Sequence, residues 1–329
     1  MESGEDKLIA RFFKPLATHA GALGLTDDAA FYAPPEGHEL VMTTDAIVAD
    51  VHFLPGDPAD TIARKALRVN LSDLAAKGAH PAGCLMTLAL PADTADDWLQ
   101  TFATGLRSDC EAFRCPLFGG DTVRTGGPLS ISIFAFGTLP RGTIIKRKGA
   151  KPGDRVFVTG TIGDAALGLG LLRDREAARS WSLHADDANA LIGRYRVPQP
   201  RVAMADAVRA SASAAMDVSD GLVGDLAKLC TVSGVSAIIE AARIPLSLAA
   251  GRALTAKPDL IETIATGGDD YEILAAVPAE KSAIFGKTAA AAGFSVTDIG
   301  EIVAGHEPPR VRGADGATLT FARTSFSHF

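Results

Sequence analysis

Six short segments of the sequence place aspartate among small or apolar residues, where a surface aspartate would usually have polar neighbours. An ionised carboxylate near a core is costly unless it is paired or binds a metal, and no matching set of lysines or arginines stands beside these aspartates. Mg²⁺ prefers hard oxygen ligands and is commonly held by a few carboxylates together with substrate phosphates. The pattern therefore predicts a phosphate ligand that is brought in by metal ions. The segments are residues 26–30, 42–48, 70–76, 118–122, 216–221 and 267–272.

Each segment also has a purely structural interpretation. Residues 27–28 fit a solvated turn, and Asp45 fits the polar end of an apolar strand. Asp73 lies off the apolar stripe of its predicted helix, which fits a solvent-exposed helix face. Turn chemistry alone accounts for residues 119–121 and 219–221. The pattern recurs mostly after predicted strands or at predicted helix starts, which favours metal binding, and both interpretations stay open here.

Strands and helices in both halves of the chain are expected to position these aspartates. Leu67, Leu71 and Leu74 form one apolar stripe, which predicts a helix over 58–77, and Gly78 would end that helix. A second helix is predicted over 164–173 and a helical stretch after residue 200. Apolar or alternating runs predict strands over 39–45, 84–91, 129–136, 155–159, 236–240, 273–277 and 295–302.

The organisation of these elements favours two domains. Strands alternate only loosely with helices, so we expect an α+β protein with two mixed α/β domains and not one doubly wound parallel sheet. The 329 residues are about twice a typical domain of roughly 150 residues. Residues 141–154 are rich in turn formers and positive charge, which is typical of a boundary. We therefore expect domains at residues 1–145 and 146–329.

Composition excludes several classes of protein. Hydrophobic residues at 47% and charged residues at 22% exclude a disordered or fibrous chain. The net charge of −7 argues against nucleic acid and anionic membranes as partners. The sequence opens on acidic residues and has no run of about 18 apolar residues, so we expect a cytoplasmic protein. Complete P-loop, GxGxxG, HExxH and GxSxG motifs are absent, which disfavours the enzyme classes that carry them.

Taken together, the segments resemble the thiamine-monophosphate kinase family, part of the superfamily that also holds aminoimidazole ribonucleotide synthetase, selenophosphate synthetase and a hydrogenase maturation protein. The resemblance spans nearly the whole chain, and residues 52–53, 267–272 and 326–329 are its parts most particular to the kinase. It implies an N-terminal domain that binds ATP and metal and forms a homodimer. It also implies a C-terminal domain of the aminoimidazole ribonucleotide synthetase type that completes the nucleotide and substrate sites.

The activity implied by this resemblance is ATP-dependent transfer of the γ-phosphoryl group to the phosphate of thiamine monophosphate, giving thiamine diphosphate, with several Mg²⁺ ions between the two ligands. No covalent intermediate or general base is assigned, because a phosphate acceptor is already a nucleophile. The metal ligands that the resemblance implies are Asp28, Thr43, Thr44, Asp45, Asp73, Asp121, Asp217 and Asp220. The implied ATP contacts are Gly120, Asp121, Arg147 and Ser219, and the implied thiamine contacts are His52, Asp269 and Phe326.

The sequence departs from the family pattern at three places. Thr26 stands where the family usually has glycine, and its Cβ disfavours a positive φ. Asp269 replaces a glutamate and is one methylene shorter, and Ser325 replaces a glycine. Two alternatives remain: a related ATP-dependent synthetase of the superfamily that acts on another acceptor, and a non-catalytic metal-binding scaffold. The first cysteine is Cys84, which disfavours selenophosphate synthetase.

Overall fold

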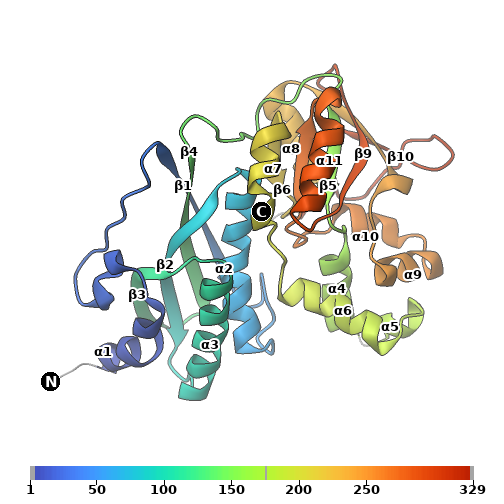
Figure 1. Cartoon of the computed structure of the whole chain (residues 1–329). Coiled ribbons are helices and arrows are strands. Elements are labelled where there is room, and N and C mark those ends of the chain that lie inside the picture. Colours follow the sequence, from blue (N-terminus) through green and yellow to red (C-terminus); the bar gives the residue numbers. More distant parts are fainter. Residues whose placement is uncertain (1–3, 175, 327–329) are drawn as a thin grey trace. The chain divides into compact units, whose positions relative to one another are not determined.

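A computed structural model describes residues 4–174 and 176–326 of the chain (Figure 1). The chain divides into two compact units. The first unit comprises Met1–Leu74 and Ala79–Gly142, and the second comprises Ala75–Gly78 and Thr143–Phe329. Each unit combines helices with its own β-sheet, which confirms the predicted α+β class with two mixed domains.

The first unit is a sheet with two long helices along one face (Figure 1). Its helices are α1 (Gly4–Leu8), α2 (Ala59–Ala76) and α3 (Asp96–Ala112), with the short helices η1 (Ile9–Phe13), η2 (Lys14–Leu16) and η3 (Ala20–Leu25). Its strands are β1 (His38–Val48), β2 (His80–Pro91), β3 (Leu117–Thr125) and β4 (Ser130–Pro140). The strand order is β1, β4, β2, β3, with antiparallel pairs except for the parallel pair β2 and β3.

Side chains of this sheet alternate between a buried face and an open face. Val41, Ile47 and Ile133 are buried on the face that also carries Thr43, whose hydroxyl donates to Asp73 on α2. Leu40 and Met42, which point to the opposite face, are 39% and 61% exposed. The sheet is therefore covered over much of one side and open over much of the other.

Strand β3 was not predicted from the sequence, because two consecutive glycines in 119–121 are typical of a turn. The strand forms because Gly120 adopts a φ of 156°. A Cβ at this position would lie 1.8 Å from the carbonyl oxygen of Met86 on β2, so only glycine allows the two strands to approach.

The second unit is a sheet between two layers of helices (Figure 1). Its helices are α4 (Asp164–Arg173), α5 (Ala177–Ser180), α6 (Ala185–Arg196), α7 (Ala205–Ser211), α8 (Leu222–Ser233), α9 (Leu248–Ala256), α10 (Leu260–Thr266) and α11 (Ser282–Ala291), with the short helices η4 (Val202–Met204), η5 (Ala241–Arg243) and η6 (Ala279–Lys281). Its strands are β5 (Arg155–Thr159), β6 (Ala214–Asp217), β7 (Ser236–Glu240), β8 (Ile273–Val277), β9 (Val296–Val303) and β10 (Arg310–Arg312). The strand order is β10, β7, β9, β5, β8, β6, and only β10 and β7 pair in parallel.

The central strands of this sheet are buried on both faces. Val156 and Val158 pack into the core on the side of α4, α8 and α10, and Phe157 packs into the core on the side of α7 and α11. This double burial explains why β5 and β8 read as continuous apolar runs and were predicted to the residue. The helix predicted over 164–173 is α4, and the helix predicted over 58–77 is α2.

Within the described part of the chain, no helix is long and apolar enough to cross a membrane. The cytoplasmic location expected from the sequence stays a prediction.

Candidate functional site

The first unit contains a cavity of about 670 Å³ over β2, β3 and β4. Asp27, Asp28 and Asp121 line it, and all three side chains are exposed. Gly120 lines it as well, so two of the implied metal ligands and two of the implied ATP contacts meet at one cavity. The apolar lining comes mainly from Phe13, Leu25, Leu85, Phe118 and Phe134.

The loop that carries Asp27 and Asp28 tolerates the departure at position 26. Thr26 has a φ of −120°, which is ordinary for a residue with a Cβ. The positive φ values fall instead on Leu23, Gly24 and Leu25, at 51°, 61° and 54°. The Thr26 hydroxyl donates a hydrogen bond to the carbonyl oxygen of Leu23 at 2.7 Å. The turn is therefore completed without a glycine at position 26.

A second group of implied metal ligands lies between β1 and α2. The Thr43 hydroxyl donates a hydrogen bond to Asp73 Oδ2 at 2.6 Å, and the Asp45 amide donates one to Asn70 Oδ1 at 3.0 Å. Asp73 thus faces the strand, and its interpretation as a residue of a solvent-exposed helix face is wrong. Thr44 points to the opposite face of β1 because side chains alternate along a strand.

The strand register separates the two groups. Asp45 stands in one row with Ile133, Met86 and Gly120, whereas Asp121 stands in the next row. Residues in neighbouring rows point to opposite faces of a sheet. In one chain, Asp45 and Asp121 therefore lie on different faces.

No three His, Cys, Asp or Glu side chains are arranged to hold a metal within residues 4–174 and 176–326. The donors that line the cavity nevertheless fit Mg²⁺, which usually keeps several waters and completes its shell with substrate phosphates. Exposed carboxylates beside an open cavity suit a metal that arrives with its ligand, and they do not form a closed structural site.

His52 and Arg147 lie outside these groups. His52 follows β1, where its Nδ1 accepts a hydrogen bond from the Val48 amide at 3.1 Å and its carbonyl oxygen accepts one from Lys65 Nζ at 2.8 Å. The imidazole therefore helps to hold the turn after β1. Arg147 is exposed on the segment before β5, and Ser233 Oγ donates to its carbonyl oxygen at 3.5 Å.

In the second unit, two loops bring the remaining predicted residues together. The Asp269 amide donates to the carbonyl oxygen of Ser219 at 2.8 Å, which joins an implied thiamine contact to an implied ATP contact. The Phe326 amide donates to the carbonyl oxygen of Asp220 at 2.9 Å, and the Phe326 ring is half-exposed. Asp217 ends β6 and is buried. Residues 327–329 of the predicted terminal motif lie outside the described residues.

A lysine accompanies one of these aspartates, contrary to the expectation from the sequence. Lys228 Nζ donates to Asp220 Oδ2 and, at 2.9 Å, to Asp225 Oδ1. Asp225 Oδ2 also accepts the amides of Ser219 and Asp220, at 3.0 and 2.9 Å. Burial raises the pKa of Asp225 and opposes charge on Lys228, but the two carboxylates outweigh that burial and raise the pKa of Lys228. The sequence signal that was missed is the i, i+3 spacing of Asp225 and Lys228 on α8.

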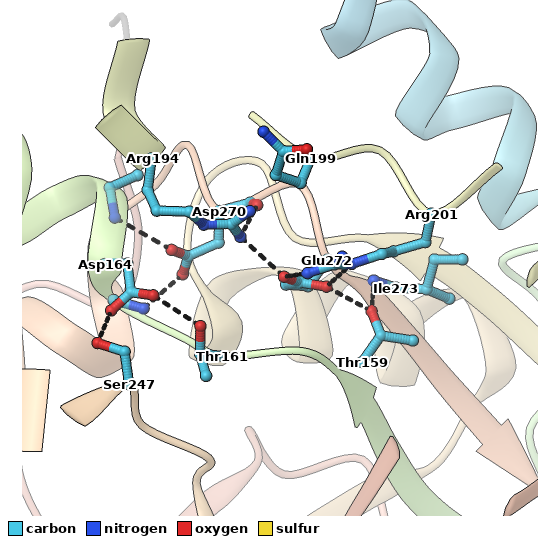
Figure 2. Close-up of polar contacts among 12 residues, drawn as sticks. Thr159, Thr161, Asp164, Arg194, Gln199, Arg201, Ser247, Asp270, Glu272 and Ile273 are labelled. Atoms are coloured by element: carbon cyan, nitrogen blue, oxygen red, sulfur yellow. Dashed lines mark hydrogen bonds and ion pairs between the residues drawn. The ribbon is translucent and has the colours of Figure 1, made fainter. Parts of the chain in front are cut away.

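A buried polar network around Asp270 and Glu272, in the loop over residues 267–272, was also missed from the sequence (Figure 2). Asp270 and Glu272 are both buried, although they follow Asp269, a predicted thiamine contact, by one and three positions. Burial raises the pKa of Asp270 well above its ordinary value, and the hydrogen bond from the Gly163 amide opposes that shift. Acidic residues in the segment 267–272 were the available signal, but their partners lie on other elements.

Comparison with known proteins supports the resemblance. The family model described as AIR synthase related protein, N-terminal domain, matches residues 26–139, and the corresponding C-terminal domain model matches residues 151–310. The chain is 45% identical over 301 residues to the thiamine-monophosphate kinase of Caulobacter vibrioides, an alignment that covers 90% of this chain and 83% of that protein. The chain belongs to the thiamine-monophosphate kinase family. The predicted enzyme class is thereby confirmed at the level of the family.

Solved structures of the thiamine-monophosphate kinase family share this fold. The thiamine-monophosphate kinase of Stenotrophomonas maltophilia K279a superposes with a TM-score of 0.82 at 37% identity, covering 95% of this chain and 96% of that chain. AaThiL complexed with AMPPCP and TMP superposes with a TM-score of 0.77 at 32% identity, covering 92% of this chain and 91% of that chain. The two-domain architecture expected from the sequence is thus confirmed.

Proposed function

We propose that this chain transfers the γ-phosphoryl group of ATP to the phosphate of thiamine monophosphate, giving thiamine diphosphate and ADP. The observation that carries the proposal is the 45% identity over 90% of the chain to a thiamine-monophosphate kinase. The complex of AaThiL with AMPPCP, an ATP analogue, and TMP supports the choice of the two substrates.

Mg²⁺, when bound, neutralises phosphate charge and helps to align the reacting groups. Asp28 and Asp121 fit this role at the cavity, because both are exposed carboxylates at a space large enough for phosphate groups. Thr43, Asp45 and Asp73 form the second candidate set of oxygen donors. In the second unit, Asp217 and Asp220 are the candidates, and Lys228 offsets the charge of Asp220.

The other residues bind and orient the substrates. Phosphoryl transfer depends mainly on alignment and charge stabilisation, and the acceptor phosphate needs no base to become a nucleophile. Ser219 and Arg147 are proposed to contact ATP, and Arg147 offers a planar set of donors for phosphate oxygens. Asp269, His52 and Phe326 are proposed to contact thiamine. The half-exposed Phe326 ring can offer its face to the cationic thiazolium.

We also propose that two copies associate through the open face of the first sheet. Leu40, Met42 and Val123 point to this face and are 39%, 61% and 42% exposed, although they are large apolar side chains. Exposed apolar surface on one sheet face is typical of an interface. Light scattering should give twice the 34.0 kDa of one chain, and Met42→Glu should shift the protein to the monomer mass. A wild-type monomer at micromolar concentration would contradict this interface.

The test of the activity is direct. The purified chain is incubated with ATP, Mg²⁺ and thiamine monophosphate, and chromatography quantifies thiamine diphosphate and ADP. We expect equal amounts of both products, and none when EDTA is present or when AMPPCP replaces ATP. Formation of ADP without thiamine diphosphate would point to another acceptor, and the absence of both products would contradict catalysis.

A further inference from the structure

The loop over residues 267–272 has an unfavourable backbone conformation. Asp269 and Tyr271 have φ values of 72° and 52°, in the left-handed region that side chains with a Cβ disfavour. Such conformations persist where the surrounding structure imposes them, and they are concentrated at functional sites. The side chains that alternate with these two residues, Asp270 and Glu272, are both buried.

Asp270 ties the loop to the start of α4. Its Oδ2 accepts a hydrogen bond from the Gly163 amide at 2.7 Å, and its Oδ1 accepts one from the Ala165 amide at 3.4 Å (Figure 2). Gly163 is the residue before the first turn of α4 and has no side chain to cap that helix. Asp270 therefore provides from a distant part of the chain the acceptor that a helix N-terminus requires.

Glu272 ties the loop to two arginines. Its Oε1 accepts from Arg194 Nη2 at 2.8 Å and also from Arg201 Nη2, and its Oε2 accepts from Arg201 Nε at 2.6 Å (Figure 2). The Thr159 hydroxyl donates to Oε2 at 2.6 Å and accepts the Ile273 amide at 2.8 Å. Arg194 Nη2 also reaches the carbonyl oxygen of Asp270 at 3.4 Å. The contacts of Glu272 thus fix both the end of the loop and the start of β8.

Neighbouring glycines make room for this arrangement. A Cβ at Gly160 would lie 2.2 Å from Glu272 Oε1, and one at Gly268 would lie 2.4 Å from the carbonyl oxygen of Ser219. Both glycines therefore allow close packing around the loop. Glu272 itself is completely buried, so it acts on any ligand only through the loop that it holds.

We propose that Glu272, bound by Arg194 and Arg201, is a positioning residue that holds Asp269 beside Ser219 before substrate binds. The inference rests on the proposed function, which supplies thiamine monophosphate as the ligand of Asp269. Charge-assisted, bidentate hydrogen bonds from a planar guanidinium fix the geometry of a carboxylate, which suits a residue that must maintain a strained backbone.

The main test is Glu272→Gln, which keeps the size of the side chain but removes its charge. One of the two acceptor oxygens is replaced by an NH2 group, which cannot accept hydrogen bonds from the arginines. We expect the KM for thiamine monophosphate to rise roughly 10- to 100-fold, because small displacements of a binding group are costly. We expect the KM for ATP to rise by a smaller factor, because ATP is reached only through Ser219, whose carbonyl oxygen accepts the Asp269 amide. Amide hydrogen exchange of residues 269–272 should accelerate. Arg201→Lys, a milder change, should shift both measurements in the same direction and serves if Glu272→Gln folds poorly.

Asp109→Asn is the matched control. Asp109 is also a buried carboxylate bound by two arginines, with Arg68 Nη2 at 2.8 Å and Arg64 Nε at 3.4 Å from its Oδ1. It lies on α3 in the first unit. We expect this variant to lower the Tm without changing the KM for thiamine monophosphate or the exchange of residues 269–272. Equal effects of the two variants on those readouts would overturn the positioning role.

A double-mutant cycle with Asp269→Gly completes the test. If Glu272 acts through Asp269, Glu272→Gln should raise the KM for thiamine monophosphate no further in the Asp269→Gly background. Additive effects would overturn the inference. If the wild-type chain makes no thiamine diphosphate, the proposed function fails, and the hydrogen-exchange comparison alone then decides whether Glu272 holds the loop.

Discussion

Replacing Gly120 with alanine tests the geometry of the cavity most directly. Gly120 lines the cavity and lies in β3, where its φ is 156°. A Cβ there would sit 1.8 Å from the carbonyl oxygen of Met86, although real Cβ atoms essentially never approach a neighbour more closely than 3.0 Å. The obstructing atom belongs to the backbone of β2, so β2 and β3 would have to separate.

The size of the effect follows from these two conflicts. Overpacking of a well-packed site costs about 1 to 3 kcal/mol. A backbone conformation that residues with a Cβ rarely adopt costs roughly 1 to 3 kcal/mol. We therefore expect Gly120→Ala to lower the free energy of unfolding of the first unit by about 2 to 6 kcal/mol. Because Asp121 follows directly, phosphoryl transfer should fall as well.

The assay uses the two tryptophans of the chain, of which Trp98 lies on α3 in the first unit and Trp181 in the second. In a Trp181→Phe background, the fluorescence of Trp98 reports urea unfolding of the first unit. Gly126→Ala is the control, since a Cβ at Gly126 meets no atom within 4 Å. It should change stability by less than about 0.5 kcal/mol. A similarly small change in Gly120→Ala would refute the reasoning.

Three further predictions concern charged and aromatic residues. Asp45→Asn and Asp121→Asn should each reduce Mg²⁺-dependent product formation by roughly 100-fold, while both exposed sites leave unfolding free energy within about 0.5 kcal/mol. Phe326→Ala should raise the KM for thiamine monophosphate about 2- to 30-fold and leave the KM for ATP unchanged, as steady-state kinetics would show. Burial raises the pKa of Asp270, so the native state binds its proton more tightly than the unfolded state. This difference stabilises the native state at pH values below the ordinary pKa of 3.8, and the stabilisation is lost as the pH rises towards the raised pKa. The Asp270→Asn variant should not show this loss when urea unfolding is measured at several pH values.

Each of these predictions has an opposing outcome. Wild-type turnover in both aspartate variants would contradict the metal assignment. Loss of activity at every Mg²⁺ concentration, together with a lowered Tm, would indicate a structural role. For Phe326→Ala, an equal rise of both KM values would return the ring to packing. For Asp270→Asn, a stability profile parallel to that of the wild type at every pH above about 4 would contradict the direction of the shift.

Local patterns predicted the regular elements well where burial alone decides them. The runs at 155–159, 236–240 and 273–277 match observed strands to the residue. Consecutive apolar residues in each run place apolar side chains on both faces of the strand, which is typical of a strand inside a sheet. Strand β3 and strand β6 were not predicted. The first contains consecutive glycines, and the second has only the residues Ala214–Asp217. Their pairing with β2 and β8 creates them, and local propensity does not reveal that pairing.

The sequence identified candidate site residues, but it did not predict which of their side chains contact one another. Aspartate in apolar surroundings identified Asp73, but the helix pattern placed it in solvent because Thr43, its partner, is distant in sequence. Glu272 stands inside a segment that the sequence singled out, yet its arginines are 71 and 78 residues away. Such partners become visible only in the folded chain, since sequence spacing carries no information about them.

The hydrogen bond between Asp269 and Ser219 has a thermodynamic consequence. The Tyr271 amide also donates to the carbonyl oxygen of Val218 at 2.8 Å, and the Val218 amide donates to that of Glu272 at 2.8 Å, so the ladder between β6 and β8 continues into both loops. Because these hydrogen bonds join the two loops, a ligand that shifts one loop also shifts the other. If nucleotide binding lowers the Kd for thiamine monophosphate by some factor, linkage requires that thiamine monophosphate lower the Kd for nucleotide by the same factor. The two substrates should consequently bind with positive cooperativity within a single chain, and titrating each in the presence of the other measures one shared coupling constant.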